Sequence, residues 1–553
     1  MRVGVAPWPE AFAARYRERD LWRGVPLGVA FAERAERTPS RVALVDGEQS
    51  WRYGDLAEAV DLLAERLARH HGPGEALLVQ LPNVAEFVVL TLACFRVGVV
   101  PVMALPQHRR GEIGYLLAHS EASGWAVSAE FRGGAHLELV TELAAGAPAL
   151  RQVWVQGGSG GDGCCDLSAA CRRGGDLAAA RSVISRRSPG GSDAAVLLLS
   201  GGTTGRAKLI ARSHDDYALN ARLTASACEV GEDTVYLVAL PAAHNFALAC
   251  PGILGVLLSG GTVVLSDSPA PEKAFGLIER HRATHTAVVP AVAHRWAEHA
   301  GGGGHDLSSL RSVAVGGSRL APALARRLES SLGARVQQGF GMAEGLINYT
   351  RLDDPDEVRW ETQGRPVCPA DEVRIVDELD RDVPGGAVGE LLTRGPYTIR
   401  GYFRAPEHNA ASFTRDGWYR TGDLVRWHPT GNLVVEGRRK DVINRGGEKV
   451  SAEEVEELAL GHPDVARAAA VAAPDPVLGE RVCLYVVPRG AVELTVQVLR
   501  EHMTDAGAAG YKLPELLHTV PELPVTNVGK IDKNALRADA AARARGSRPD
   551  VEK

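Results

Sequence analysis

Short apolar runs rich in β-branched residues alternate with helix-like patterns through most of the chain, and this alternation limits the possible folds more than any other feature. Residues 195–199, 262–265 and 287–289 are such runs. Strands that alternate with helices favour parallel or mixed sheets covered by helices. We therefore predict an α/β fold for the greater part of the chain, and its 553 residues predict two or more domains.

The pattern of predicted secondary structure changes near residue 370. Closely spaced short strands separated by turns are expected from there on, at residues 373–377, 389–393 and 432–436. This spacing predicts a small barrel or an antiparallel sheet attached to the α/β body.

Another compact α/β unit is predicted to begin beyond residue 440. Ser451, followed by Glu454, has the capping-box pattern that starts a helix. Two apolar strands are expected after this helix, near residues 468–473 and 481–487. The end of the chain from Ala538 is rich in Ala, Arg and Asp, and we expect a frayed tail there.

Charge and cysteine content narrow the class of protein. The 62 basic and 68 acidic residues leave a formal net charge of −6, so no partner such as nucleic acid or an anionic membrane is indicated. The eight cysteines form no C-x-x-C pair, which disfavours a zinc ribbon or a dense disulfide framework. Scattered cysteines and an N-terminus without a signal-peptide pattern lead us to expect a cytoplasmic protein.

Two apolar segments have the hydropathy of candidate membrane spans. Residues 87–106 contain Arg96, whereas residues 246–265 carry no charge at all. Pro251 and the glycine pair at residues 260–261 interrupt the second segment. In both places we predict the buried helix, turn and buried strand of an α/β core.

Residues 157–163 match two functional patterns at once, G-x-G-x-x-G and G-x-S-x-G, after an apolar run. A dinucleotide-binding or hydrolase interpretation is therefore formally open. Low-complexity sequence satisfies both patterns in the same way, and no acidic residue obviously completes a ribose site. We favour a flexible surface loop.

The most informative segment for chemistry is the glycine- and threonine-rich run that follows the predicted strand at residues 195–199. Glycines let the backbone turn its N–H groups towards an anion, hydroxyls add hydrogen bonds, and a lysine adds positive charge. The run does not match a Walker A loop, and a simple tight turn is the alternative. Its density of such residues favours a polyphosphate-binding loop. The residues predicted to bind phosphate are Ser200, Gly201, Gly202, Thr203, Thr204, Gly205 and Lys208.

Three later segments carry weaker signals. Asp423 follows a tight turn and can accept both hydroxyls of a ribose, although Gly-Asp turns are common. The charged run at residues 437–449 contains a Gly-Gly pair, which suits either a solvated linker or a hinge that faces an anionic ligand. Lys530 lies on a glycine turn near the C-terminus, a place where most lysines are simply exposed.

In this order and at these intervals, the four segments resemble the adenylate-forming superfamily of acyl-CoA synthetases, peptide-synthetase adenylation domains and luciferases. The resemblance covers about residues 8–537. It implies an enzyme that uses ATP and Mg²⁺ to convert a carboxylic acid into an acyl-adenylate and then passes the acyl group to a thiol. The implied architecture is a body of two βα subdomains and a small β-barrel over residues 1–437, a hinge at 438–441, a mobile α+β domain over 442–540 and a tail over 541–553.

The resemblance also assigns roles in the large body. The loop at residues 200–208 would wrap the ATP phosphates, and the adenine would lie against Gly316 and Gly317. Glu344, in the run Gly-Met-Ala-Glu, would be a catalytic residue and the ligand of Mg²⁺. His244 is a further catalytic residue implied by the resemblance.

Further roles fall on the C-terminal part of the chain. Asp423 would hold the ribose hydroxyls, and Arg438 would contact ribose or phosphate. Lys530 would bridge the carboxylate and the α-phosphate, and Lys440 would be the hinge residue about which the small domain rotates. The residues on the face exposed to the thiol after that rotation would be Gly447 and Lys449.

A closer resemblance concerns residues 244–251 and 341–351, which look like those of the stand-alone aryl-acid ligases of siderophore and aryl-capped peptide pathways. These enzymes activate 2,3-dihydroxybenzoate or salicylate. The resemblance implies that Asn245 hydrogen-bonds the 2-hydroxyl of the acid. The other residues expected to line the acid site are Phe246, Cys250, Ser318, Gly339, Gly341 and Ile347.

Three of these positions depart from the dihydroxybenzoate pattern. Phe246 and Cys250 stand where that subgroup typically has tyrosine and serine, so a 3-hydroxyl would lose partners, at a cost of about 1–3 kcal/mol if buried unpaired. We therefore expect a preference for salicylate. Gly339 replaces the usual valine, which either makes room for a ring substituent or a second ring, as in a methylsalicylate, a hydroxypicolinate or a bicyclic hydroxy acid, or only relaxes the backbone.

The acceptor thiol stays open. No carrier-protein serine motif follows Lys530, so an aryl carrier protein would have to be a separate chain, and coenzyme A is the alternative acceptor. A non-catalytic nucleotide-binding protein of the same fold is a third interpretation. The presence of Thr203, Glu344, Asp423 and Lys530 argues against it.

Overall fold

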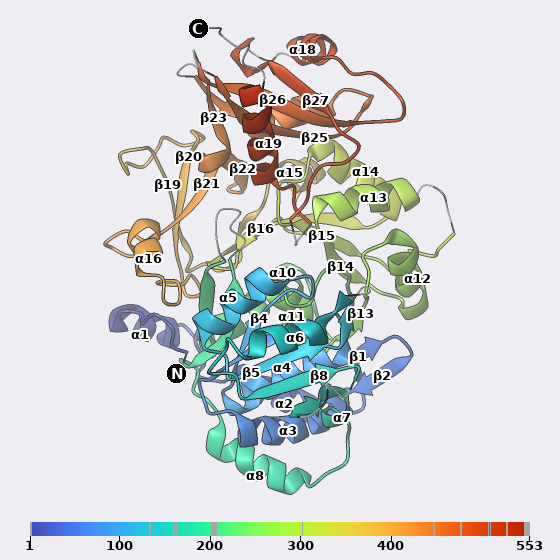
Figure 1. Cartoon of the computed structure of the whole chain (residues 1–553), viewed down its shortest axis with the longest axis vertical. Helices are drawn as coiled ribbons and strands as arrows, with labels where there is room; N and C mark the ends of the chain where they lie inside the picture. The colour runs from blue at the N-terminus through green and yellow to red at the C-terminus, as the bar shows by residue number, and fades with distance from the viewer. Residues whose placement is uncertain are drawn as a thin grey trace. The chain divides into compact units, whose positions relative to one another are not determined.

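The structure is a computed structural model that describes residues 3–546 except 132–133, 159–160, 162, 201–206, 301, 303, 446–447, 476–477, 507, 509 and 527–528. The chain divides into two compact units (Figure 1). The first extends as far as Glu372 and takes up Thr393–Tyr419, and the second holds Val373–Leu392 and the residues from Arg420 onward. The predicted domain limits at residues 437 and 442 remain a prediction.

Two large sheets form the first unit. In the described part of the chain one is nine-stranded, with the order β18-β17-β16-β15-β14-β12-β13-β1-β2. Its inner strands from β16 to β1 pair in parallel, and the strands at both ends are antiparallel. Its strands are β1 (Val42–Asp46), β2 (Gln49–Arg52), β12 (Val235–Val238), β13 (Thr262–Leu265), β14 (His285–Val288), β15 (Ser312–Gly316), β16 (Arg335–Met342), β17 (Gly345–Tyr349) and β18 (Arg365–Pro366).

The other sheet has seven strands among the described residues, in the order β11-β10-β4-β3-β5-β8-β9. All of its pairs are parallel except that of β10 with β11. Its strands are β3 (Ala76–Gln80), β4 (Val100–Met103), β5 (Gly124–Ser128), β8 (Gln152–Gln156), β9 (Cys164–Asp166), β10 (Ala194–Leu199) and β11 (Leu209–Ser213). The two parallel sheets confirm the α/β class expected from the alternating pattern.

Apolar helices lie between these sheets. α4 (Ala85–Val97) is buried on nearly all sides and contacts both β1 of the nine-stranded sheet and β4 of the seven-stranded sheet. α2 (Leu27–Arg37) and α3 (Tyr53–His70) pack against α4 and against each other, as Figure 1 shows. A helix that is buried all round needs no polar face, which explains the continuous apolar sequence of this segment.

Both candidate membrane spans are parts of this core. The first forms α4 and then β4, and the second forms α10 (Asn245–Ala249), α11 (Gly252–Ser259) and β13, so the predicted helix, turn and strand are confirmed in each. Among the described residues, every helix is too short or too polar to cross a membrane.

The glycine-rich run at residues 157–163 connects strand β8 to another strand, β9, and not to a helix. A dinucleotide-binding turn would lead into a helix, whose N-terminus binds the pyrophosphate. The described residues of the run form a loop, and Ser159, Gly160 and Asp162 lie outside the described residues. The low-complexity interpretation is therefore the better one.

The second unit contains the small β structure predicted after residue 370. It is four-stranded among the described residues, in the order β19 (Glu372–Val376), β20 (Gly389–Arg394), β21 (Tyr419–Trp427) and β22 (Leu433–Arg438). A short 3₁₀ helix, η1 (Arg439–Asp441), leads from β22 into the next sheet.

That next sheet belongs to the predicted C-terminal α/β unit. Its described strands are β23 (Val442–Arg445), β24 (Glu448–Ser451), β25 (Val465–Asp475), β26 (Gly479–Pro488) and β27 (Leu516–Thr519), and its helices include α17 (Ala452–Leu460), α18 (Val496–Asp505) and α19 (Lys533–Gly546). Ser451 caps α17 by accepting a hydrogen bond from the backbone N–H of Glu454, which confirms the predicted helix start.

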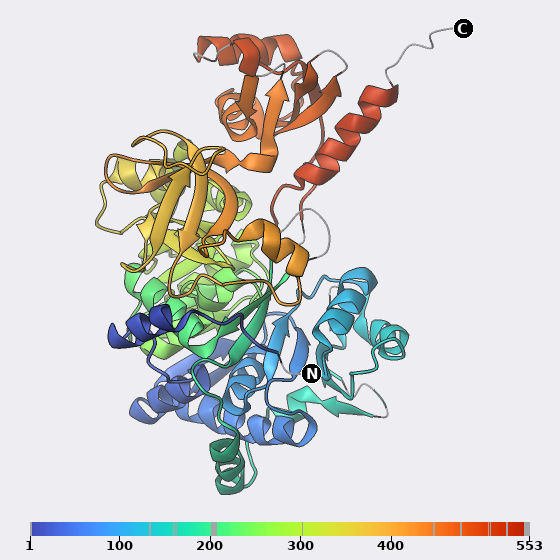
Figure 2. The ribbon, with the colours of Figure 1, turned by 90° about the vertical axis from the view of Figure 1, so that its left-hand side faces the viewer.

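The expectation of a frayed tail from Ala538 is wrong as far as residue 546. These residues form the second half of α19, the red helix in Figure 2. Leu536 and Ala540 are buried beside β25 and β26, and the Tyr485 hydroxyl donates to Asp539 Oδ2 at 2.7 Å. Alanine and arginine are strong helix formers, so the composition that suggested disorder equally suits a docked helix.

Candidate active site

Ser200 and Lys208 close the glycine–threonine loop that joins β10 to β11. The Ser200 N–H donates to the Lys208 carbonyl at 2.9 Å, and the Lys208 N–H donates to Ser200 Oγ at 3.0 Å. The two ends of the loop are therefore fastened together. The other predicted phosphate-binding residues, Gly201, Gly202, Thr203, Thr204 and Gly205, lie outside the described residues.

Tyr402 joins Lys208 to Glu344. Its hydroxyl donates to Glu344 Oε1 at 2.8 Å, and Lys208 Nζ lies 4.6 Å from the centre of its ring. Tyr402 and Glu344 are both buried. No sequence signal marks Tyr402, because a tyrosine after a glycine is too common.

A second unpredicted residue, Arg212, supports the turn between β16 and β17 that carries Glu344. Its fully buried guanidinium donates to the Ala343 carbonyl at 2.9 Å and to Asp216 Oδ1 at 2.7 Å. On the other side of Glu344, Gly345 has φ +155°, and a Cβ there would lie 2.4 Å from Thr398 Cα. The turn is thus held from both sides.

We expect Tyr402→Phe to slow acid-dependent ATP–pyrophosphate exchange by roughly 10- to 100-fold. This range corresponds to the about 1.5–3 kcal/mol of a hydrogen bond to a charged group, here the one that orients Glu344. The exchange rate should also need more Mg²⁺ for half-saturation.

Tyr53→Phe is the matched control, because the buried Tyr53 hydroxyl donates to the carbonyls of Leu257 and Gly261, away from Glu344. Equal losses in the two variants would contradict the role of Tyr402.

Asn245 has a fixed amide. Its Oδ1 accepts from the Tyr217 hydroxyl at 2.8 Å, and its Nδ2 donates to Cys250 Sγ at 3.5 Å. Burial raises the pKa of the Tyr217 phenol, so this hydroxyl stays neutral and able to donate. The preceding residue, His244, is the N-cap of α10, where its Nδ1 accepts from the Phe246 N–H at 3.3 Å. Tyr217 carried no sequence signal.

Gly316, Gly339 and Phe246, which are predicted to line the acid or adenine site, lie close together. A Cβ placed on Gly316 would lie 2.9 Å from the Gly339 carbonyl oxygen and 3.0 Å from Phe246 Cζ. Gly341 and Ile347 face each other in the register of β16 and β17. Gly317 and Ser318 are exposed just beyond β15.

Asp423 and Arg438, in the second unit, form an ion pair across β21 and β22, with Arg438 Nε 2.7 Å from Asp423 Oδ1. Burial raises the pKa of the Asp423 carboxyl, although the positive charges of Arg438 and Lys530 act to lower it. Asp423 Oδ2 is buried and has no hydrogen-bond partner among the described residues. A buried acceptor without a donor suits a ligand hydroxyl.

Lys530 lies at the end of a tight turn, where the Thr526 N–H donates to the Lys530 carbonyl at 2.6 Å and Gly529 has φ +78°. Lys440 lies in η1, between the two sheets of the second unit. Gly447 and the side chain of Lys449 lie outside what the structure describes. The hinge and the thiol-facing surface therefore stay predictions.

Glu344 can serve as one protein ligand of a nucleotide-bound Mg²⁺. Within the described part of the chain no group of three or more His, Cys, Asp or Glu side chains could hold a metal by itself. Mg²⁺ is commonly held by one or two carboxylates together with substrate phosphates and water. A single buried carboxylate near Lys208 fits that arrangement.

Comparison with known proteins agrees with this chemistry. A family model described as AMP-binding enzyme matches residues 31–403, and one described as AMP-binding enzyme C-terminal domain matches residues 454–530. A Streptomyces protein named salicylyl-CoA synthase / salicylate adenylyltransferase is 54% identical, covering 97% of each chain. The 2-hydroxy-7-methoxy-5-methyl-1-naphthoate–CoA ligase of Streptomyces carzinostaticus is 49% identical, also over 97% of each. The solved apo structure of Mycobacterium smegmatis MbtA is similar with a TM-score of 0.71 and 43% identity, covering 97% of this chain and 98% of that one.

Proposed function

Because the chain belongs to the family of AMP-binding enzymes, we propose that it condenses a 2-hydroxy aryl acid with ATP to an aryl-adenylate and then transfers the aryl group to a thiol. It is an acid–thiol ligase. The observation that carries the choice of acid is the Asn245 amide, whose oxygen accepts from Tyr217 and whose Nδ2, among the described residues, has a 3.5 Å contact to the Cys250 sulfur. An amide N–H held in this way is a donor for the oxygen of an ortho-hydroxyl group.

In the first step, a carboxylate oxygen attacks the α-phosphorus of ATP and pyrophosphate leaves. In the second step, the thiol sulfur attacks the carbonyl carbon and AMP leaves. Both steps build negative charge on phosphate oxygens, so fixed positive charge accelerates them.

The residues described above have, each within its own unit, the chemistry that a nucleotide requires. Lys208 offers positive charge to the phosphates, and Asp423 Oδ2 accepts from a ribose hydroxyl, while Arg438 contacts ribose or phosphate. Lys530 offsets the charge that grows at the α-phosphate. Glu344, oriented by Tyr402, would hold Mg²⁺, and the ion would supply Lewis-acid charge to the phosphates.

The predicted acid site provides only weak hydrogen-bond partners for a 3-hydroxyl group among the described residues. Burial raises the pKa of the Cys250 thiol to about 11, so it stays neutral and is only a weak partner. The Cys250 sulfur already receives the amides of Asn220 and Asn245, at 3.6 and 3.5 Å. Phe246 contributes an apolar ring. These contacts support salicylate over 2,3-dihydroxybenzoate.

Acid-dependent ATP–pyrophosphate exchange over a panel of acids tests the proposal. Salicylate should exceed 2,3-dihydroxybenzoate by about 10-fold in kcat/KM, from the about 1–3 kcal/mol cost of an unpaired hydroxyl. Benzoate should be poorer than salicylate in the native enzyme but not in Asn245→Leu, which lacks the donor. A preference for 2,3-dihydroxybenzoate would contradict the choice of acid, and no exchange with any aryl acid would contradict the activity.

The acceptor is coenzyme A or the phosphopantetheine of a separate aryl carrier protein. The names of the two Streptomyces relatives favour coenzyme A. Thioester formation with each acceptor, started from the same aryl-adenylate, separates the two. A cytoplasmic location stays a proposal that rests on the scattered cysteines of the sequence.

A further inference from the structure

We infer that Tyr349, from behind Gly339, sets the size of aromatic ring that the acid site accepts. The inference rests on the proposed function. It concerns a residue that does not belong to the predicted acid-binding set, and it follows from the packing of two neighbouring strands.

Gly339 on β16 and Tyr349 on β17 are directly opposite each other in antiparallel register. A Cβ placed on Gly339 would lie 2.7 Å from Tyr349 Cε1 and 3.2 Å from Tyr349 Cζ. Carbon atoms cannot approach to 2.7 Å without a shift. The space left by the missing side chain is therefore filled by the tyrosine ring and is not open to the acid.

The backbone at Gly339 gives no other reason for glycine. Gly339 is not among the described glycines with positive φ, so the main chain there is one that other residues adopt. Neither of the two explanations left open by the sequence is sufficient: the glycine neither leaves free space nor relaxes a strained turn. It accommodates Tyr349.

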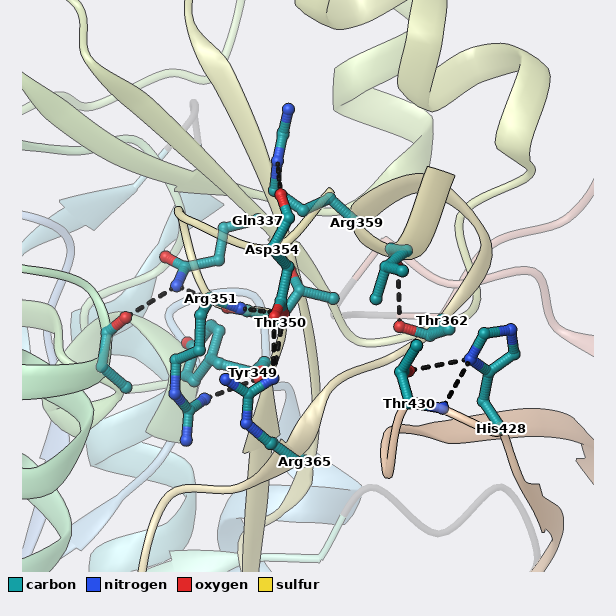
Figure 3. Close-up of polar contacts among 12 residues, drawn as sticks. Gln337, Tyr349, Thr350, Arg351, Asp354, Arg359, Thr362, Arg365, His428 and Thr430 are labelled. Atoms are coloured by element: carbon teal, nitrogen blue, oxygen red, sulfur yellow. Dashed lines mark hydrogen bonds and ion pairs between the residues drawn. The ribbon is translucent and has the colours of Figure 1, made fainter. Parts of the chain in front are cut away.

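Tyr349 is fixed at its ring and at its backbone. Its hydroxyl donates to the Cys250 carbonyl at 2.6 Å, and the whole residue is 1% exposed. Its own carbonyl accepts from Arg351 Nη1 at 2.6 Å, and the backbone N–H of Arg351 donates to Asp354 Oδ2 at 2.7 Å (Figure 3). Gly364 presses on it so closely that a Cβ there would lie 1.9 Å from the Tyr349 carbonyl carbon. The ring can move only if the bond to Cys250 breaks.

The ring is adjacent to residues of the acid site. A Cβ placed on Gly316 would meet both the Gly339 carbonyl oxygen and the Phe246 ring, and the tyrosine hydroxyl is bonded to Cys250. A second fused ring that extends past Gly339 would have to displace Tyr349. A single ring would not, so we expect the native enzyme to prefer monocyclic acids.

The test measures kcat/KM of acid-dependent exchange with salicylate and with 2-hydroxy-1-naphthoate. Tyr349→Leu shortens the side chain, and the naphthoate-to-salicylate ratio should rise by at least about 10-fold, as for other changes in the size of an apolar pocket. Tyr53→Phe removes a buried hydroxyl that is bonded to Leu257 and Gly261 rather than to the acid site, and it should leave the ratio within about threefold of the native value.

Gly339→Val should lower exchange with both acids, because the new side chain collides with the ring. Combined with Tyr349→Leu, it should regain salicylate exchange and lose the gain with naphthoate. Equal loss with both acids in Tyr349→Leu, so that the ratio does not change, would overturn the inference. Absence of exchange in the native enzyme would instead overturn the proposed function.

If Tyr349→Leu does not fold, the pair Gly339→Ala and Gly339→Ala/Tyr349→Phe tests the contact between residue 339 and the ring on which the inference rests. The methyl group should impair salicylate exchange, and loss of the hydroxyl bond to Cys250 should let the ring turn and restore exchange. No recovery in the double variant would overturn the inference.

Discussion

Lys530→Ala is expected to slow aryl-adenylate formation by at least about 10²- to 10³-fold, the loss typical of removing one electrostatic contact to a transition state. A carboxylate is a weak nucleophile towards a nucleotide that carries four negative charges. The reaction therefore depends on positive charge placed where the phosphoryl charge grows. Rapid-quench measurement of the first turnover reports this step directly.

The defect should be confined to adenylation. Transfer of the aryl group from supplied aryl-adenylate to the thiol should stay within a few-fold of the native rate, because that step does not use the same contact. Lys512→Ala is the control: this lysine is in the same unit and pairs with Glu454, outside the proposed nucleotide site. Near-normal adenylation in Lys530→Ala would remove the residue from the mechanism.

Arg212→Met is expected to lower the free energy of unfolding of the first unit by about 3–5 kcal/mol, because it leaves the buried Asp216 carboxylate without its partner. The side chains of Arg212 and Asp216 are 0% and 4% exposed. Burial already raises the pKa of Asp216 despite the nearby guanidinium, so its charge is costly even in the native protein. Urea unfolding followed by tryptophan fluorescence measures the loss.

The double variant Arg212→Met/Asp216→Leu separates pairing from packing. With both charges removed, much of the lost stability should return. Arg280→Met is the surface control, since its partner Glu48 is largely exposed, and we expect a change below about 1 kcal/mol. A loss in Arg212→Met no larger than in this control would show that the buried pair does not support the turn at Glu344.

Some parts of the site could be predicted from sequence because neighbouring residues carry the information. Ser200 and Lys208 lie at the ends of one loop after a buried strand, and Ser451 caps the helix that it precedes. The helix formed by residues 538–546 was missed because alanine-rich sequence suits both a free tail and a docked helix. Tertiary contacts such as the hydrogen bond between Tyr485 and Asp539 and the burial of Ala540 distinguish the two.

The α/β class could be predicted from the alternation of apolar runs, because the periodicity of burial is a local property of the sequence. The ATP chemistry could be predicted from the order of the glycine, aspartate and lysine segments, because the chemistry of a functional group is local as well. The residues that hold the site residues in place could not be predicted in this way. Tyr402, Arg212, Tyr217 and Tyr349 reach the site through contacts between strands and helices distant along the chain. What occupies the space beside Gly339 depends on the register of β16 against β17, and register is a property of the folded sheet.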